Sequence, residues 1–137
     1  MKVQLFISAR KLKNMDTFSK SDPRCYAKSH TESYTTVKEQ VNGKWIKRGK
    51  TESKSNTLNP DFDTHIEMDY YFERTQKLKF VMKDGDTNSS EKIGETETTL
   101  ASIMGKKAQT FEGDLLQNNI VIHGKVIVRA EAVKQSN

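Results

Sequence analysis

The sequence has little cysteine, proline or glycine, and each shortage excludes a class of protein. Its single cysteine, Cys25, cannot form an internal disulfide, which argues against a disulfide-stapled secreted domain and fits a reducing, cytosolic setting. Two prolines and seven glycines among 137 residues exclude a collagen-like or low-complexity chain. Cys25 stands in a strand-like segment, where we expect a small buried side chain.

Long apolar runs and phosphate-binding glycine loops are also missing. No stretch approaches the roughly 20 apolar residues of a membrane-spanning helix. The first eight residues enter a strand pattern at once and lack the apolar core of a signal peptide. The three histidines, His30, His65 and His123, are scattered along the chain. With no glycine loop for a nucleotide and no grouped histidines, the sequence predicts a protein that is not an enzyme.

The length of the chain indicates how many cores it can form, and its charge indicates which kinds of molecule it attracts. A chain of 137 residues can bury one core, which we expect over residues 1–133, before a frayed polar tail over 134–137. The 23 basic and 18 acidic residues give a formal charge of +5. A basic protein is attracted to polyanions, either nucleic acid or an anionic membrane surface. The acidic residues gather in two loops, and the basic residues gather around 44–54.

Short alternating or β-branched segments recur along the chain with almost no helical pattern. They predict an all-β fold, an eight-stranded antiparallel β-sandwich. Asn42-Gly43 is a hairpin signal, and Thr99 is an expected cap of one or two helical turns up to Met104. The expected strands are residues 3–8, 24–28, 34–40, 45–53, 65–70, 78–83, 93–98 and 124–132, with a weaker strand signal over 110–115.

Two acidic segments follow two of these strands. The first contains Asp16 and Asp22, and the second contains Asp84, Asp86 and Glu91. Calcium takes about six to eight oxygen ligands at about 2.3–2.6 Å, so a site requires carboxylates that fold back toward one another. Ser, Asn, Gly and Pro in both segments favour such turns. Carboxylates gathered without a cation repel one another, and the sequence therefore predicts a calcium site if the two segments meet.

Two other interpretations of the acidic segments are open at this point. Acidic residues with serine and asparagine also make ordinary soluble loops. The second segment matches several EF-hand loop positions, from Asp84 to Glu95, but Ser89 replaces the expected glycine and Glu91 replaces an apolar residue. Residues 78–83 also have strand period rather than helix period. The EF-hand interpretation is therefore disfavoured.

Five short segments along the chain form a recognisable set of motifs: Leu12–Asp16, Ser19–Pro23, Thr57–Phe62, Phe80–Asp86 and Ile93–Glu95. With these motifs and the strand pattern, the chain resembles a C2 domain over nearly its whole length. Phe18–Pro23, Asp69–Phe72 and Thr99–Met104 make it most similar, within that family, to the first C2 domain of copines. The similarity implies a C2-type Greek key, and the strand order resembles the type II topology.

The resemblance implies a set of calcium ligands. Asp16 and Asp22 match the aspartates of the first C2 loop, and Asp84 and Asp86 match the first aspartates of the third. Glu91 stands where the family usually has a further aspartate, in a loop about one residue short. The main-chain carbonyl of Met15 is implied as an additional ligand.

The resemblance also implies contacts with a membrane. Phe18 lies at the tip of the first acidic segment, where it either inserts into the bilayer or packs against the base of its own loop. The basic residues after Asn42-Gly43 resemble the polybasic strand of C2 domains, which contacts phosphoinositide head groups, although a solvated outer face explains them as well. By period two, Arg48, Lys50 and Lys54 are expected on one face. The full basic set is Lys44, Lys47, Arg48, Lys50 and Lys54.

The predicted function is therefore calcium-dependent binding to anionic phospholipid, phosphatidylserine above all and also phosphoinositides, by a monomeric cytoplasmic module that moves to the membrane when calcium rises. The alternative is a C2 module that binds proteins or phosphoinositides without calcium. Nucleic-acid binding, suggested by the high charge, lacks a recognition motif and interleaved exposed aromatic residues.

Overall fold

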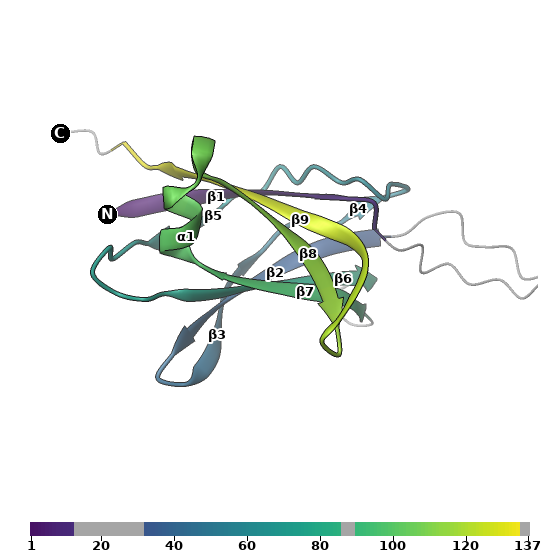
Figure 1. The fold of residues 1–137 in the computed structure, drawn as a ribbon. Helices are drawn as coiled ribbons and strands as arrows, with labels where there is room; N and C mark the ends of the chain where they lie inside the picture. Colours follow the sequence, from purple (N-terminus) through teal and green to yellow (C-terminus); the bar gives the residue numbers. More distant parts are fainter. Residues whose placement is uncertain (13–31, 86–89, 135–137) are drawn as a thin grey trace, which may run out of the picture.

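The computed structural model describes residues 1–12, 32–85 and 90–134. The expected strand over 24–28 lies outside these residues. The described part contains antiparallel strands and very little helix (Figure 1). The elements are β1 (Lys2–Arg10), β2 (Glu32–Val41), β3 (Lys44–Lys50), β4 (Lys54–Ser55), β5 (Ile66–Asp69), β6 (Lys77–Gly85), β7 (Ser90–Thr99), α1 (Leu100–Gly105), the 3-10 turn η1 (Lys107–Gln109), β8 (Thr110–Gln117) and β9 (Ile120–Ala132).

The strands form two packed halves that are joined at one edge. The order is β3-β2-β6-β7-β8-β9-β1-β5, with the short β4 paired to β2. β7 and β8 are paired only at Glu95 and Leu116, so the sheet folds over along this line. The prediction of an all-β antiparallel sandwich is confirmed, although the described residues include nine strands because β4 contributes two residues. The type II order stays a prediction.

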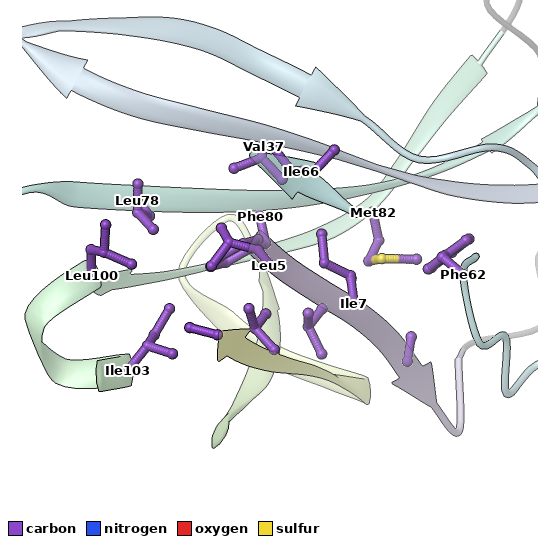
Figure 2. Packing of buried hydrophobic residues seen from close by; sticks show 14 of the residues in the cluster. Leu5, Ile7, Val37, Phe62, Ile66, Leu78, Phe80, Met82, Leu100 and Ile103 are labelled. Atoms are coloured by element: carbon purple, nitrogen blue, oxygen red, sulfur yellow. The ribbon is translucent and has the colours of Figure 1, made fainter. Parts of the chain in front are cut away.

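Alternation along the strands builds the core between the two halves. Val3, Leu5 and Ile7 of β1 are buried in one cluster with Leu78, Phe80 and Met82 of β6. Figure 2 shows Leu5 and Ile7 facing Phe80 and Met82. Val126 and Val128 of β9 and Ile103 of α1 close the same cluster. Burying a side chain of this size contributes about 1.5–3 kcal/mol, so this apolar face holds the strands in register.

The predicted turn and cap are both present. Asn42 and Gly43 have φ of 52° and 77°, the left-handed values that a tight two-residue hairpin requires. The hydroxyl of Thr99 accepts a hydrogen bond of 3.1 Å from the backbone N–H of Ser102, which caps α1. Both of these local features were therefore predictable from the sequence.

Different structural elements lie at the two ends of the sandwich. At one, which we call the loop end, β1 finishes, β2 starts, and β6 passes to β7; Ser33 pairs with Asp84 there. At the other, the helix end, the backbone N–H of Leu100 donates to the carbonyl of Gln76 at 2.9 Å, and Tyr70 N donates to Met1 O at 2.7 Å. Figure 1 shows α1, the start of β1 and the end of β9 at the helix end. Both acidic segments therefore begin or finish at the loop end.

Gly94 lets β7 approach the β8–β9 hairpin closely. A Cβ at this position would lie 2.9 Å from Ile122 Cδ1 and 3.1 Å from the carbonyl oxygen of Leu116. Contacts this short force side chains and backbone apart. Gly105, in contrast, has no heavy atom within 4 Å of a Cβ.

We expect Gly94→Ala to lower the free energy of unfolding by about 1–3 kcal/mol, because β7 and the hairpin must separate to admit the methyl group. Urea denaturation followed by circular dichroism measures this change. Gly105→Ala is the matched control and should be neutral or slightly stabilising, since alanine favours helix. Equal stability of the two variants would refute the tight packing of β7 on the hairpin.

Candidate functional site

The end of β6 and the beginning of β7 place two carboxylates opposite each other. Asp84 pairs with Glu91 across the strands, and on its other side it pairs with Ser33 of β2. Directly opposed residues share a face of the sheet, with Cβ atoms about 4.5–5.5 Å apart. Like charges so placed destabilise the pair unless a cation lies near them. A cation bound beside Asp84 and Glu91 would relieve this repulsion.

Asp84 also contacts the beginning of β2. Its Oδ1 accepts a hydrogen bond of 3.0 Å from the backbone N–H of Glu32, the first residue of β2. The first described strand after β1 therefore begins against the side chain of Asp84. A half-buried carboxylate held in this way has a fixed direction, as a ligand to a metal requires.

The remaining predicted ligands fall in segments that the structure does not describe. Asp84 and Glu91 are the two predicted ligands within the described residues, and within these the acidic, histidine and cysteine side chains form no group of three that could hold a metal. Asp84 and Glu91 supply the oxygen donors that calcium prefers, and two carboxylates are fewer than a calcium site needs. The positions outside the described residues are Met15, Asp16, Phe18, Asp22 and Asp86.

The Leu58-Asn59-Pro60 motif fixes the place where the first acidic segment leaves β1. The backbone N–H of Lys11 donates to Asn59 Oδ1 at 2.9 Å, and the N–H of Leu12 donates to the carbonyl of Leu58 at 2.9 Å. Ala9 N donates to the carbonyl of Pro60 at 2.9 Å. The motif is therefore hydrogen-bonded to the last described residues before the first acidic segment.

A β-bulge divides the basic residues of β3 between two faces. The register with β2 shifts between Val37 and Lys38, so that Lys47 lies opposite Lys38 and Lys50 lies opposite Thr36. Arg48 is the extra residue of the bulge, and its side chain turns to Glu39 at 2.9 Å. The expectation that Arg48, Lys50 and Lys54 share one face was therefore wrong. It assumed an unbroken period of two, which a bulge interrupts.

The remaining two predicted basic residues, Lys44 and Lys54, lie apart from Lys47 and Lys50. Lys44 lies opposite Val41, on the same side of the strand pair as Arg48. Lys54 Nζ lies 2.8 Å from Asp63 Oδ2 and 3.6 Å from Glu52 Oε2. The hydrogen bond to Asp63 raises the pKa of Lys54 and keeps its charge matched by an acid. The positive charge of Lys54 is therefore already balanced by neighbouring acids, and Lys54 is less available to a ligand than Lys47 or Lys50.

Lys47 and Lys50 instead border a shallow cationic groove on the outer face of β2, β3 and β6. Buried Tyr34 and Thr36 form part of its lining. Lys50 Nζ lies 5.7 Å from the centre of the Tyr34 ring. In this part of the fold the described side chains show no ion pair for Lys38, Lys47, Lys50 or Lys83. The lining residues are Tyr34, Thr36, Lys38, Trp45, Lys47, Lys50 and Lys83.

Trp45 stands at the edge of this groove and is a residue that the sequence did not single out. Its ring lies 4.2 Å from Lys79 Nζ, a cation–π contact. Lys38 and Lys83 were missed as well, because they belong to strands other than β3. The signal for Lys83 was its even spacing from Lys79 in a strand pattern, which places both lysines on one face.

Comparisons with known proteins agree with this geometry. The C2 domain model matches residues 3–115. Copine-A of Dictyostelium discoideum is 39% identical over 137 residues, covering 98% of this chain and 21% of that protein. Nicotinic receptor-associated protein 1 of Caenorhabditis elegans is 38% identical over 116 residues, covering 74% of this chain and 18% of that protein. The chain spans about a fifth of the length of these relatives.

Solved structures show the same fold. A C2 domain of plant extended synaptotagmin 1 superposes with a TM-score of 0.69 at 19% identity, covering 94% of this chain and 91% of that one. A calcium-bound pair of C2 domains from extended synaptotagmin 2 gives a TM-score of 0.66 at 18% identity, covering 95% of this chain and 44% of that one. The predicted resemblance to C2 domains and to copines is confirmed, and the chain belongs to the C2 domain family.

Proposed function

We propose that this C2 domain is a calcium-dependent targeting module for membranes that contain anionic phospholipid, phosphatidylserine in particular. The observation that carries the proposal is the position of Asp84, opposite Glu91 and hydrogen-bonded to Glu32, the first residue of β2. The family membership and the fold shared with a calcium-bound relative support it. The module is non-catalytic and monomeric in this proposal, and it moves from the cytoplasm to the membrane surface when calcium rises.

The ligand set combines described and undescribed residues. Asp84 and Glu91 would hold calcium together with Asp16, Asp22, Asp86 and the carbonyl of Met15, by resemblance to the family. Bound calcium neutralises carboxylates and offers coordination places to lipid oxygens. The protein's contribution is to fix Asp84 through Glu32 N and to hold the starts of both segments at one end. Phe18 in the first segment would add an apolar contact with the bilayer.

A second candidate function is calcium-independent binding of phosphoinositide head groups in the cationic groove. The bulge that gathers Lys47 and Lys50 beside Lys38 and Lys83 favours it. A phosphorylated head group presents several negative oxygens to this set, and Trp45 gives the groove an aromatic wall. Basic residues near an anionic leaflet contribute about 1 kcal/mol each.

The test of the calcium site is Asp84→Asn. An asparagine can still accept the hydrogen bond from Glu32 N, so we expect the fold to persist while calcium affinity falls at least about tenfold. Calorimetric titration with calcium measures the affinity, and co-sedimentation with vesicles of phosphatidylserine and phosphatidylcholine measures membrane binding.

Asp69→Asn removes the same charge at the helix end, where Asp69 pairs with Lys2 at 3.4 Å, and it should leave both measurements unchanged. If the unaltered protein gives no heat and no thermal shift at millimolar calcium, the calcium proposal is wrong.

The test of the cationic groove compares two adjacent residues on opposite faces. With calcium chelated, we expect Lys47→Gln to weaken binding to vesicles containing phosphatidylinositol bisphosphate about fivefold, which corresponds to about 1 kcal/mol. Arg48→Gln makes the same change in charge outside the groove and should not alter binding. Equal losses in the two variants would indicate attraction by net charge alone and would remove the groove as a site.

A further inference from the structure

The tip of the β8–β9 hairpin is a tight, rigid turn. Asn118 and Asn119 have φ of 52° and 64°, which is the left-handed pair of a two-residue hairpin turn. Asparagine tolerates this conformation better than most residues. Gln117 and Ile120 form the pair next to the turn, and Leu116 with Val121 forms the following one.

Two aliphatic side chains beside this turn are left in solvent. Ile120 is 67% exposed and Val121 is 61% exposed. Neighbouring residues of a strand point to opposite faces, so the hairpin tip is apolar on both sides. The next residue, Ile122, is partly buried and packs against the core. The exposure therefore begins where the hairpin extends beyond the body of the sandwich.

The tip projects at the loop end. The last pair between β9 and β1 is Lys125 with Arg10, so residues 120–124 of β9 continue past the end of β1. The hairpin follows the line from Glu95 toward the beginning of β7, where Glu91 lies. Figure 1 shows the β8–β9 turn at the same end of the molecule as the end of β6.

We propose that Ile120 and Val121 enter the interfacial layer of the bilayer, as an apolar anchor at the loop end of the domain. This inference rests on the proposed function and extends it to a hairpin that supplies none of the predicted calcium ligands. A fluid layer surrounds both faces of a narrow tip, whereas a flat protein partner would cover one face. The insertion is shallow, because the amides of Asn118 and Asn119 lie at the turn and belong among the polar head groups.

One exposed basic residue stands at the base of the hairpin. The carbonyl oxygen of Lys11 lies 3.2 Å from the position of a Cβ on Gly124. A basic residue near an apolar tip adds electrostatic attraction to an anionic interface.

The first experiment is the double variant Ile120→Thr with Val121→Thr, in which threonine keeps the β-branched shape that suits a strand. We expect its partitioning to vesicles of phosphatidylserine and phosphatidylcholine, with calcium present, to fall about tenfold, while its calcium affinity without lipid stays unchanged. Phe72→Thr is the matched control, because Phe72 is 82% exposed in the loop between β5 and β6 at the helix end. This control should bind as the unaltered protein does.

The second experiment detects insertion directly. In a Trp45→Phe background, Ile120→Trp places the single tryptophan at the tip, and Phe72→Trp places it at the helix end. We expect brominated acyl chains to quench the fluorescence of the first variant and not that of the second.

Unchanged vesicle affinity of the double variant, or equal quenching of the two tryptophan variants, would overturn the anchor and leave the proposed function standing. Failure of the unaltered protein to bind these vesicles at millimolar calcium would overturn both.

Discussion

The pairing of β2 with β6 decides which side chain reaches which surface. Its register places Val37 opposite Phe80 in the core, and it places Tyr34 opposite Lys83 on the outer face. The same register brings Ser33 beside Asp84 at the loop end. A slip by one residue would turn lysines inward and core residues outward, so burial of the apolar face enforces all three outcomes together. The candidate metal ligand and the cationic groove are both consequences of one strand pair.

The elements governed by local chemistry were predictable from the sequence. The Asn42-Gly43 hairpin and the Thr99 cap depend on neighbouring residues, and alternation identified the strands of the core. The faces of the basic residues were not predictable in the same way. They depend on a bulge at Arg48, which belongs to the pairing of β3 with β2 and is not visible as a pattern within β3. The face that each basic residue occupies is therefore decided by the pairing of β3 with β2.

The candidate site was predictable in part for a related reason. Strand alternation followed by Gly85 identified Asp84 as the last acidic residue of a strand. Glu91 belongs to β7 and lies opposite Asp84. This pairing depends on how many residues connect β6 to β7 and on the register shift after Met82. Sequence spacing alone does not give that shift. The structure places Asp84 and Glu91 opposite each other, and the roles of all the predicted ligands stay predictions.

The two proposed membrane contacts lie in different directions on one rigid body. The loop end lies at the tips of the strands, whereas the cationic groove lies on the broad outer face of β2, β3 and β6. If the loop end contacts a bilayer, the strands stand steeply, and if the groove contacts it, they lie flatter. The start of β1 and the end of β9 lie at the helix end, so anything joined there would be held at a different height in each case. Lipid composition would then set the tilt of the domain as well as its residence on the membrane.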